Sequence, residues 1–434
     1  MTVSVSWIGA LIGLALAIIL ILRKLNPVYS LLLGTIVGAL IGGANLTQTV
    51  NIVVTGSQSV MGTVVRVLAA GVFAGVMMES GAANAIARGI VNKFGESLAI
   101  LSLALATMII TAVGVFIPVA VLIVAPIALE VGSRMQISKL ALLVALSGGG
   151  KAGNIISPNP NTIAAAHGFH LELSQLMVAD FIPAVFGLLA TVVIATLLRH
   201  HGTLATMADV QANQAQGDDQ SAMPLPSLGT AIVAPLLAVI LLLLNPVGSV
   251  LHIGLLEKFN VDAMYILPLA GLIGMLAMHQ GKQVLAYTKA GMARMTDVVL
   301  ILIGAGAIGG LITTSTLPAV IVHLIKVSGI SGTFLAPIAG ILMAAATAST
   351  STGVILATGS FGKAILAFGT APLAAAVMVH TGATVIDHLP QGNYFHVTAN
   401  AMNMTLKERM QSVPYETAVG LTMTIVGVMM FTLF

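Results

Sequence analysis

The sequence predicts an all-α protein that crosses a membrane many times. Of its 434 residues, 58% are hydrophobic and only 7% are charged, whereas a soluble domain carries about 25% charged residues. Apolar runs such as 5–22, 178–198, 228–244 and 417–434 each have roughly the length that an α-helix needs to cross about 30 Å of hydrocarbon. The runs are continuously apolar, without the alternation of a membrane β-barrel. The 45 glycines suit helices that pack through small residues.

Composition also limits the function. The chain has no cysteine, which excludes disulfides, thiolate metal sites and cysteine nucleophiles. The net charge of +3 comes from basic residues in loops, so we expect no nucleic-acid partner. An intramembrane protease needs paired aspartates, a serine–histidine pair or an H-E-x-x-H motif. That motif does not occur in the sequence, and Asp387 has no obvious aspartate partner in the membrane. We therefore expect no enzyme, no metal site and no cofactor.

The basic residues predict the topology. Arg23 and Lys24 follow the first span and no charge precedes it, so the positive-inside rule places the N-terminus outside. Ten spans then leave the C-terminus outside as well: 5–22, 28–43, 64–79, 140–168, 178–198, 228–244, 263–278, 298–314, 372–390 and 417–434. In this arrangement twelve basic residues lie inside and four, Arg66, Lys258, Lys326 and Lys363, lie outside. Two further apolar segments, 98–126 and 334–362, are predicted as re-entrant hairpins, because a full crossing would spoil this bias.

The order of elements repeats in the two halves of the chain. Residues 1–199 form a first repeat of five spans with hairpin 98–126, and residues 227–434 form a second with hairpin 334–362. Between them, the polar segment 200–226 is predicted as a flexible cytoplasmic linker. Five crossings in each half give the halves opposite orientations, which is the inverted repeat of secondary transporters, with the binding site where the halves meet.

Four segments interrupt the predicted spans and hairpins: 110–118, 147–162, 347–353 and 380–395. Non-helical backbone within a bilayer is tolerated only where it lines a cavity or is buried in protein. The strongest interruption is 147–162 (SGGGKAGNIISPNPNT), because three consecutive glycines and two prolines do not favour a regular helix that faces lipid. The alternative interpretation of this segment is an ordinary loop outside the membrane.

These interruptions supply the candidate substrate site. Freed amides and helix N-termini favour a carboxylate, Lys151 adds a positive charge, and polar side chains could bond hydroxyl groups. The predicted substrate-binding residues are Gly149, Lys151, Asn154, Asn159, Asn161, Thr162, Thr111, Ser349, Thr350, Ser351, Thr352 and Thr381. The alternative for the four hydroxyls of 349–352 is that they bond to turns of their own helix.

Asp387 and His388 are the predicted proton-coupling residues. Charge deep in a broken span is costly, so an acid beside a histidine there is a functional hypothesis by default, and histidine titrates near neutral pH. The alternative is that the pair is hydrated at the cytoplasmic end of the span. Sodium held by oxygens at Thr111 and 349–352 is the alternative coupling ion. His380 is a weaker candidate, and Asp180 is expected to be interfacial or structural.

Four segments resemble the gluconate permease (GntP) family of the ion transporter superfamily. They are GAANAIARGIVNKFG (81–95), SPNPNTIAAA (157–166), IDHLPQGNYF (386–395) and KERMQSVPYETAVGLTMTIVG (407–427). The resemblance covers nearly the whole chain. It implies proton-coupled uptake of gluconate or a related hydroxy or sugar acid by a homodimer in the bacterial inner membrane, here with both termini periplasmic. It also implies an elevator motion of a transport domain.

The sequence departs from gluconate-transporting members of that family at the predicted site. Lys151 stands where those members have a histidine, and apolar residues with Pro118 stand where they have an acidic residue. A shorter hydroxy acid such as 3-hydroxybutyrate, or another monocarboxylate, is therefore the alternative substrate. A channel is a further alternative class, which saturable, gradient-driven accumulation would exclude.

Overall fold

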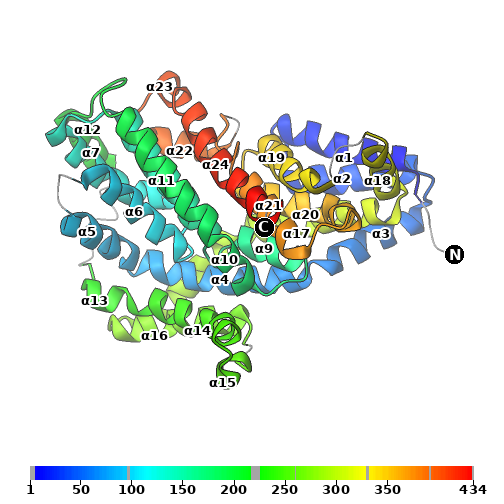
Figure 1. The fold of residues 1–434 in the computed structure, drawn as a ribbon, viewed down its shortest axis with the longest axis horizontal. Coiled ribbons are helices and arrows are strands. Elements are labelled where there is room, and N and C mark those ends of the chain that lie inside the picture. The colour runs from blue at the N-terminus through cyan, green and yellow to red at the C-terminus, as the bar shows by residue number, and fades with distance from the viewer. Residues whose placement is uncertain are drawn as a thin grey trace.

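The computed structural model describes residues 5–94, 98–216, 225–259, 261–328, 332–390 and 392–432. It consists of helices joined by turns and short loops (Figure 1), and no strand is formed within those ranges. The first half contains α1 (Trp7–Leu22), α2 (Pro27–Ile41), α3 (Leu46–Ser59), α4 (Met61–Glu79), α5 (Ala82–Phe94), α6 (Ala99–Ala112), α7 (Ile117–Met135), α8 (Lys139–Ile155), α9 (Pro160–Gly168), α10 (Leu173–Ala179), α11 (Phe181–Leu197) and α12 (Met207–Gln216). The second half contains α13 (Leu228–Ala231), α14 (Val233–Leu251), α15 (Gly254–Glu257), α16 (Ala263–Ala277), α17 (Val284–Thr314), α18 (Leu317–Ser328), α19 (Leu335–Thr347), α20 (Thr350–Ala367), α21 (Pro372–Gly382), α22 (Asn393–Ala401), α23 (Leu406–Met410) and α24 (Val413–Thr432).

The prediction of an all-α, multi-pass membrane protein is confirmed. Among the described residues, six helical segments are long and apolar enough to cross a membrane, and the pair α10–α11, bent by 42°, makes up to seven. The outer face of α11 exposes Leu189, Val193 and Leu197 at 55%, 58% and 72%, as a surface against lipid does. Helices α1, α2 and α16 are apolar but shorter. Helix α7 is long enough to cross, although the sequence predicts it as half of a hairpin. The ten-crossing topology stays a prediction.

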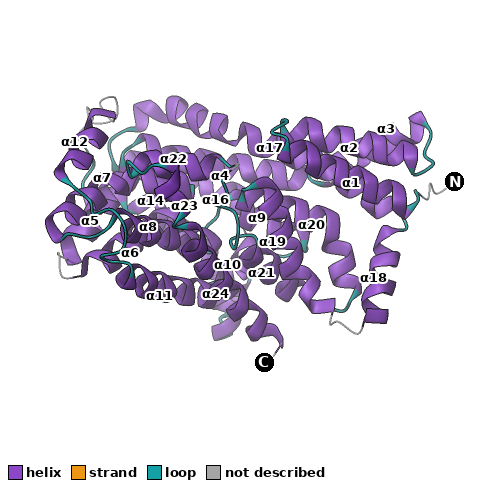
Figure 2. Cartoon of the chain, turned by 90° about the horizontal axis from the view of Figure 1, so that it is seen from above, coloured by secondary structure: helices purple, strands orange, loops and turns teal. Residues whose placement is uncertain are grey.

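Helix α8 lies at the centre of the molecule. Each of its 17 residues is buried, and it packs against α6, α7, α11 and α24. Figure 2 shows it surrounded by other helices, whereas α11 and α24 lie along one side. Because no part of α8 faces lipid, this helix can carry polar residues that a peripheral span could not.

The predicted interruption at 147–162 is wrong over most of its length. The glycine run is helical within α8, and the break extends only from residue 156 to residue 159. The glycines serve helix packing instead. A Cβ atom at Gly149 would lie 2.1 Å from the carbonyl oxygen of Ala104, and one at Gly153 would lie 2.0 Å from that of Met108. Glycine is required here because α6 and α8 touch backbone to backbone, as small residues allow in membrane helices.

The other predicted interruptions are confirmed as breaks between helices. Helices α6 and α7 are joined by a turn in which Gly114 has a φ of +96°, and α19 and α20 by a turn in which Ala348 has a φ of +47°. The chain is non-helical from residue 383 to residue 392, between α21 and α22, with residue 391 outside the described ranges. The re-entry of the two hairpins from one side of a membrane, and the opposite orientation of the two halves, stay predictions.

Helices α3 and α12 are among the helices in segments for which no helix is predicted. Helix α3 contains several polar residues, and it packs against α17, where Gly56 closely approaches the backbone of Gly306. Helix α12 lies within the segment 200–226, so that part of the predicted flexible linker is ordered. The structure anchors α12 by an ion pair of 3.2 Å between Lys139 and Asp209, and by a 2.8 Å hydrogen bond from Asn403 to the carbonyl oxygen of Asp209.

The arrangement of the helices forms a wall beside the broken segments. In both views α1, α2, α3 and α18 lie at one end of the long axis, and α5, α7 and α12 lie at the other (Figures 1 and 2). The long helix α17 packs against α2, α3, α4 and α20. Helices α9 and α20 pack against each other, and they contact α4 and α17 respectively. The wall of α3, α4 and α17 therefore faces the helices that follow two of the breaks.

The close contact of α6 with α8 can be tested at Gly153. We expect Gly153→Ala to destabilise the protein by about 1–3 kcal/mol, the usual cost of overpacking, because the new methyl group meets the carbonyl of Met108. The matched control is Gly229→Ala in α13, where no atom lies within 4 Å of the added Cβ. The measurement is the melting temperature of the purified protein in detergent. Equal melting temperatures for the two variants would contradict the packing argument.

Candidate functional site

Two breaks meet a buried lysine of α8. Lys151 lies near the carboxyl end of α8, Asp387 and His388 lie in the loop between α21 and α22, and Thr350 is the first residue of α20. The Lys151 ammonium lies 2.5 Å from Asp387 Oδ1 and 2.9 Å from His388 Nδ1. The hydroxyl of Thr350 donates to Asp387 Oδ2 over 2.5 Å. The structure therefore brings together four residues that the sequence predicts for the site, from segments far apart in the chain.

The charge of Lys151 is fully compensated. Its side chain is 0% exposed and that of Asp387 is 2% exposed. An ammonium has three N–H donors, and three acceptors surround this one: Asp387, the carbonyl oxygen of Thr384 and His388. A buried ion pair is tolerated only when its remaining hydrogen-bonding groups are also satisfied. The cluster meets this condition, and in this conformation Lys151 has no free donor for a substrate.

The surroundings of His388 define the hydrogen-bonding role of each ring nitrogen. Its Nε2 atom lies 3.0 Å from the carbonyl oxygen of Val413; a carbonyl only accepts, so Nε2 carries a hydrogen. In the neutral ring Nδ1 then accepts from Lys151. Asp387 Oδ1 lies 3.1 Å from the same Nδ1. The Nδ1 lone pair is therefore occupied by Lys151 in this conformation, and the three side chains form one closed contact.

A second buried ion pair adjoins this cluster, and the sequence interpretation missed it. Arg409 lies 2.5 Å from Glu416, and both side chains are 0% exposed. Glu416 also accepts from Ser147 on α8, whose oxygen lies 2.5 Å from the hydroxyl of Tyr394. His388 Nε2 lies 4.0 Å from Glu416, which links the two clusters. Glu416 follows Arg409 by seven positions and lies on the next helix, α24, whereas Arg409 lies on α23. No contact spacing within one helix signals this pair, and Arg409 is predicted as a loop residue.

A third group of hydrogen-bonded polar side chains, called here the third polar chain, joins the turn of hairpin α19–α20 to the bend between α10 and α11. Asp180 lies 2.7 Å from His380 Nδ1, and both side chains are 0% exposed. His380 Nε2 lies 2.8 Å from the amide nitrogen of Asn161, whose oxygen accepts from Ser351 over 3.3 Å. Asp180 is thus buried in the protein, in line with a structural role. The weaker candidate, His380, connects it to two predicted substrate residues.

The remaining predicted residues have other surroundings. Asn154, Asn159 and Thr162 bond to one another across the break between α8 and α9. Ser349 caps α20 by accepting from the backbone amide of Thr352 over 3.3 Å. Thr111 donates to the carbonyl oxygen of Gly150 and Gly149 packs against α6, so these two support the contact of α6 with α8. Thr381 donates to the carbonyl oxygen of Val377 within its own helix. Their role toward a substrate stays a prediction.

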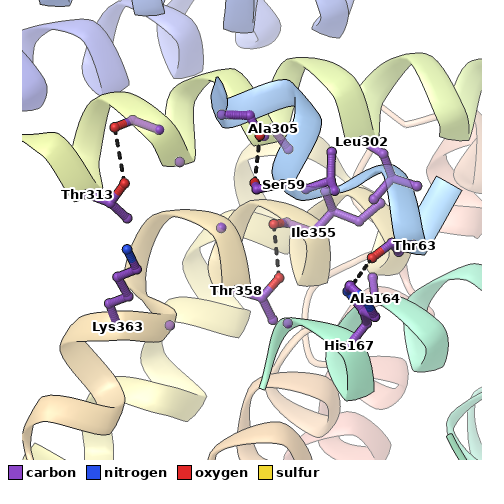
Figure 3. A pocket seen from close by; sticks show the side chains of 18 of the residues that line it. Ser59, Thr63, Ala164, His167, Leu302, Ala305, Thr313, Ile355, Thr358 and Lys363 are labelled. Atoms are coloured by element: carbon purple, nitrogen blue, oxygen red, sulfur yellow. Dashed lines mark hydrogen bonds between the residues drawn. The ribbon is translucent and has the colours of Figure 1, made fainter. Parts of the chain in front are cut away.

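A cavity of about 340 Å³ lies between the wall of α3, α4 and α17 and the helices α9 and α20 (Figure 3). None of the predicted substrate residues lines it, but Ala164 and Ile355 do. These two follow Asn161 and Ser351 by about one helical turn, roughly 5 Å, so the cavity ends near the third polar chain. Within the described ranges, no group of three histidine, aspartate or glutamate side chains is placed to hold a metal ion.

A family profile and one relative match nearly the whole chain, and other relatives match parts of it. The profile of a family described as GntP family permease matches residues 5–434. An uncharacterized transporter of Haemophilus influenzae is 48% identical over 431 residues, 99% of each chain. The D-serine transporter DsdX of Escherichia coli is 24% identical over 364 residues, 80% of each chain. A gluconate permease of Bacillus subtilis is 28% identical over 177 residues, 40% of this chain and 39% of that one.

Two solved structures share the fold. The YdaH transporter of Alcanivorax borkumensis aligns with a TM-score of 0.64 at 15% identity, covering 89% of each chain. MtrF of Neisseria gonorrhoeae aligns with a TM-score of 0.58 at 16% identity, covering 95% of this chain and 94% of that one. At these identities the likeness concerns the arrangement of helices alone.

The buried ion pair can be tested by a double-mutant cycle. Lys151→Ala leaves the Asp387 carboxylate buried without its counter-charge, which we expect to cost roughly 3–5 kcal/mol of stability. Asp387→Asn in the same chain removes the orphaned charge and is expected to restore a large part of that loss. The measurement is the melting temperature of both single variants and the double variant in detergent. A double variant that loses the sum of the two single losses would show that the residues are not coupled.

Proposed function

Because this chain belongs to the GntP permease family, we propose that it is a secondary active transporter that takes up a small organic acid together with a proton. The observation that supports this most directly is the buried cluster of Lys151, Asp387, His388 and Thr350, where two helix breaks meet a lysine of α8. Helix breaks that converge within the membrane are the usual place for a transported substrate. A buried lysine is the natural partner of a carboxylate.

Charge balance explains how proton and substrate would be coupled. In the present conformation the positive charge of Lys151 is balanced by Asp387. A proton taken up by Asp387 and His388 removes that balance and leaves the charge of Lys151 free for the carboxylate of a substrate. One proton and one carboxylate together restore the original net charge of the site. Either one alone would leave an unpaired charge inside the membrane, which is costly. The two ligands therefore favour each other's binding.

The polar groups beside Lys151 favour a hydroxylated acid. Asn154, Asn159 and Thr162 form one hydrogen-bonded group, and the N-termini of α9 and α20 add backbone amides. Such groups can bond the hydroxyls of a sugar acid or a hydroxy acid. The gluconate and D-serine specificities of two relatives belong to those proteins, and they agree with a small polar acid here. We place the protein in the bacterial inner membrane as a homodimer with both termini periplasmic.

A sodium-coupled transporter of a monocarboxylate such as hydroxybutyrate is the second candidate. The carbonyl oxygen of Asn154, the side-chain oxygen of Asn159 and the hydroxyl of Thr162 converge at the break between α8 and α9. Oxygen ligands at a broken helix are typical of sodium sites in transporters. A channel is less favoured, because the charged cluster is buried and paired rather than lining an open path.

Proton coupling is tested by Asp387→Asn in proteoliposomes. We expect the variant to lose accumulation of the acid driven by an inward pH gradient, while exchange of labelled for unlabelled acid is partly retained, because the amide cannot alternate between charged and neutral forms. The control is Glu79→Gln, the same chemical change in the half-exposed pair with Arg294. Accumulation that survives in Asp387→Asn would exclude this residue as the coupling acid.

The substrate class is tested by thermal stabilisation with sugar acids and short hydroxy acids, at two pH values and with or without sodium. A ligand that binds the folded state raises the free energy of unfolding by mass action, by about 2.7 kcal/mol at a hundredfold excess over Kd. The melting temperature rises accordingly. We expect one acid to raise the melting temperature, and the rise to be larger at lower pH. In Lys151→Ala we expect the rise to be lost with carboxylates and to be reduced less with neutral analogues. Stabilisation by neutral solutes or inorganic ions only would contradict the carboxylate assignment.

A further inference from the structure

We propose that the cavity between the wall of α3, α4 and α17 and the helices α9 and α20 is an entrance site, where the organic anion binds before it reaches Lys151. Lys363 on α20 supplies the positive charge of this site (Figure 3). The proposal rests on the proposed function for the identity of its natural ligand. Its central claim, that the cavity attracts anions through Lys363, can be tested without that ligand.

The first argument is the charge of the cavity. Its lining includes Lys363, His167 and His170 and no aspartate or glutamate. Within the described part of the chain, neither an ion pair nor a hydrogen bond holds Lys363, whereas Arg66, Lys139 and other basic residues pair with carboxylates. In Figure 3 the amine of Lys363 extends across the cavity toward Thr313 of α17. A cation without a counter-ion, at a partly enclosed surface, raises the local concentration of anions.

The second argument is the polar lining. The hydroxyls of Thr358, Thr313 and Ser59 each donate to a carbonyl oxygen of their own helix, at 2.9, 3.1 and 2.6 Å. Their hydrogens are used in this way, so their oxygen lone pairs remain as acceptors for the cavity. His167 Nδ1 contacts Thr63 over 2.9 Å. A cation combined with several hydroxyl acceptors fits a molecule with one carboxylate and hydroxyl donors, the class proposed for the substrate.

The third argument is size. The cavity volume of about 340 Å³ lies at the lower end of the range for small-molecule sites, about 300–1,000 Å³. One water molecule occupies about 30 Å³ of liquid. The cavity therefore holds a small hydroxy acid or sugar acid with part of its hydration shell, as an entrance site requires.

The fourth argument is position. Helices α9 and α20 both line the cavity, and both begin at the candidate functional site. At the inner end of the cavity, the hydrogen bond between Ser351 and Asn161 joins the two helices. At the outer end Gly168, His170 and Lys363 are exposed. The predicted topology places Lys363 outside, as one of the four basic residues that do not follow the inside bias, so an acid entering from the periplasm would meet the cavity before the buried cluster.

The absence of cysteine from the chain allows a direct test. A single thiol is placed in the lining by Thr358→Cys, and whole cells are treated with an anionic sulfonatoethyl or a cationic trimethylammonioethyl methanethiosulfonate reagent. The ratio of the two labelling rates, measured by mass spectrometry, reports the local potential. We expect Lys363→Gln to lower the anion-to-cation ratio by about fivefold or more, since one unit charge in the lining of the same cavity acts oppositely on the two reagents.

The matched control is Leu255→Cys on α15, which is 82% exposed and does not line the cavity; its ratio should not change with Lys363→Gln. Thr313→Cys is the second probe position if Thr358→Cys does not reach the membrane. An unchanged ratio at both probes, or no labelling by either reagent, would overturn the entrance site and leave the proposed transport function standing. A lowered ratio in a protein that transports no organic acid would establish the anion site and reject the proposed function.

Discussion

The ion pair between Lys151 and Asp387 is the constraint on which the arrangement of the breaks depends. An ammonium inside a membrane protein is tolerated only with a counter-charge and with all its donors satisfied. The counter-charge comes from the loop between α21 and α22, and one more acceptor is the backbone carbonyl of Thr384 in the same loop. That carbonyl is available because the chain is not helical there. The break between α21 and α22 thus places the acceptors that Lys151 requires, and Thr350 holds the hairpin α19–α20 against the same aspartate.

The packing of α8 makes this polar centre possible. A helix with lysine, serine and asparagine residues would be costly against lipid, and α8 avoids this cost because all 17 of its residues are buried. The glycines at 149 and 153 let α6 approach until backbone meets backbone. Close approach of small residues is the main source of helix association in a membrane, where apolar side chains gain little by leaving lipid. The same glycines that suggest a break in the sequence therefore provide the contacts that stabilise the central helix.

Much of the fold and the core of the candidate site could be predicted from the sequence. The length of the hydrophobic runs identifies the apolar helices. The prolines at 158 and 390 lie in the break between α8 and α9 and in the break between α21 and α22. Lys151, Asp387 and His388 were predicted because charge within an apolar run is rare. Other features could not be predicted, because they depend on contacts between distant segments. The pairing of Arg409 with Glu416 is invisible when arginine is read as a loop residue, and the helical glycine run can be explained only once α6 is beside it. The order in α12 depends likewise on Lys139, far from it in sequence.

Within the described ranges, the lysine of the proposed entrance site has no counter-ion, whereas the lysine of the inner site is already paired with a carboxylate. This difference would set the order of the steps of transport. At the entrance, Lys363 is exposed and has no partner among the described residues, so an acid can bind there in its charged, hydrated form without any protonation of the protein. At the inner site, Lys151 is already neutralised, so the same acid can replace Asp387 only after a proton has been taken up. Lys363 follows Thr350 by 13 positions in α20, roughly 20 Å along the helix, which exceeds the Debye length of about 8 Å at physiological ionic strength. The entrance site would therefore act by concentrating the acid at the start of its path, and the protonation of the inner cluster would be the step that commits the acid to transfer.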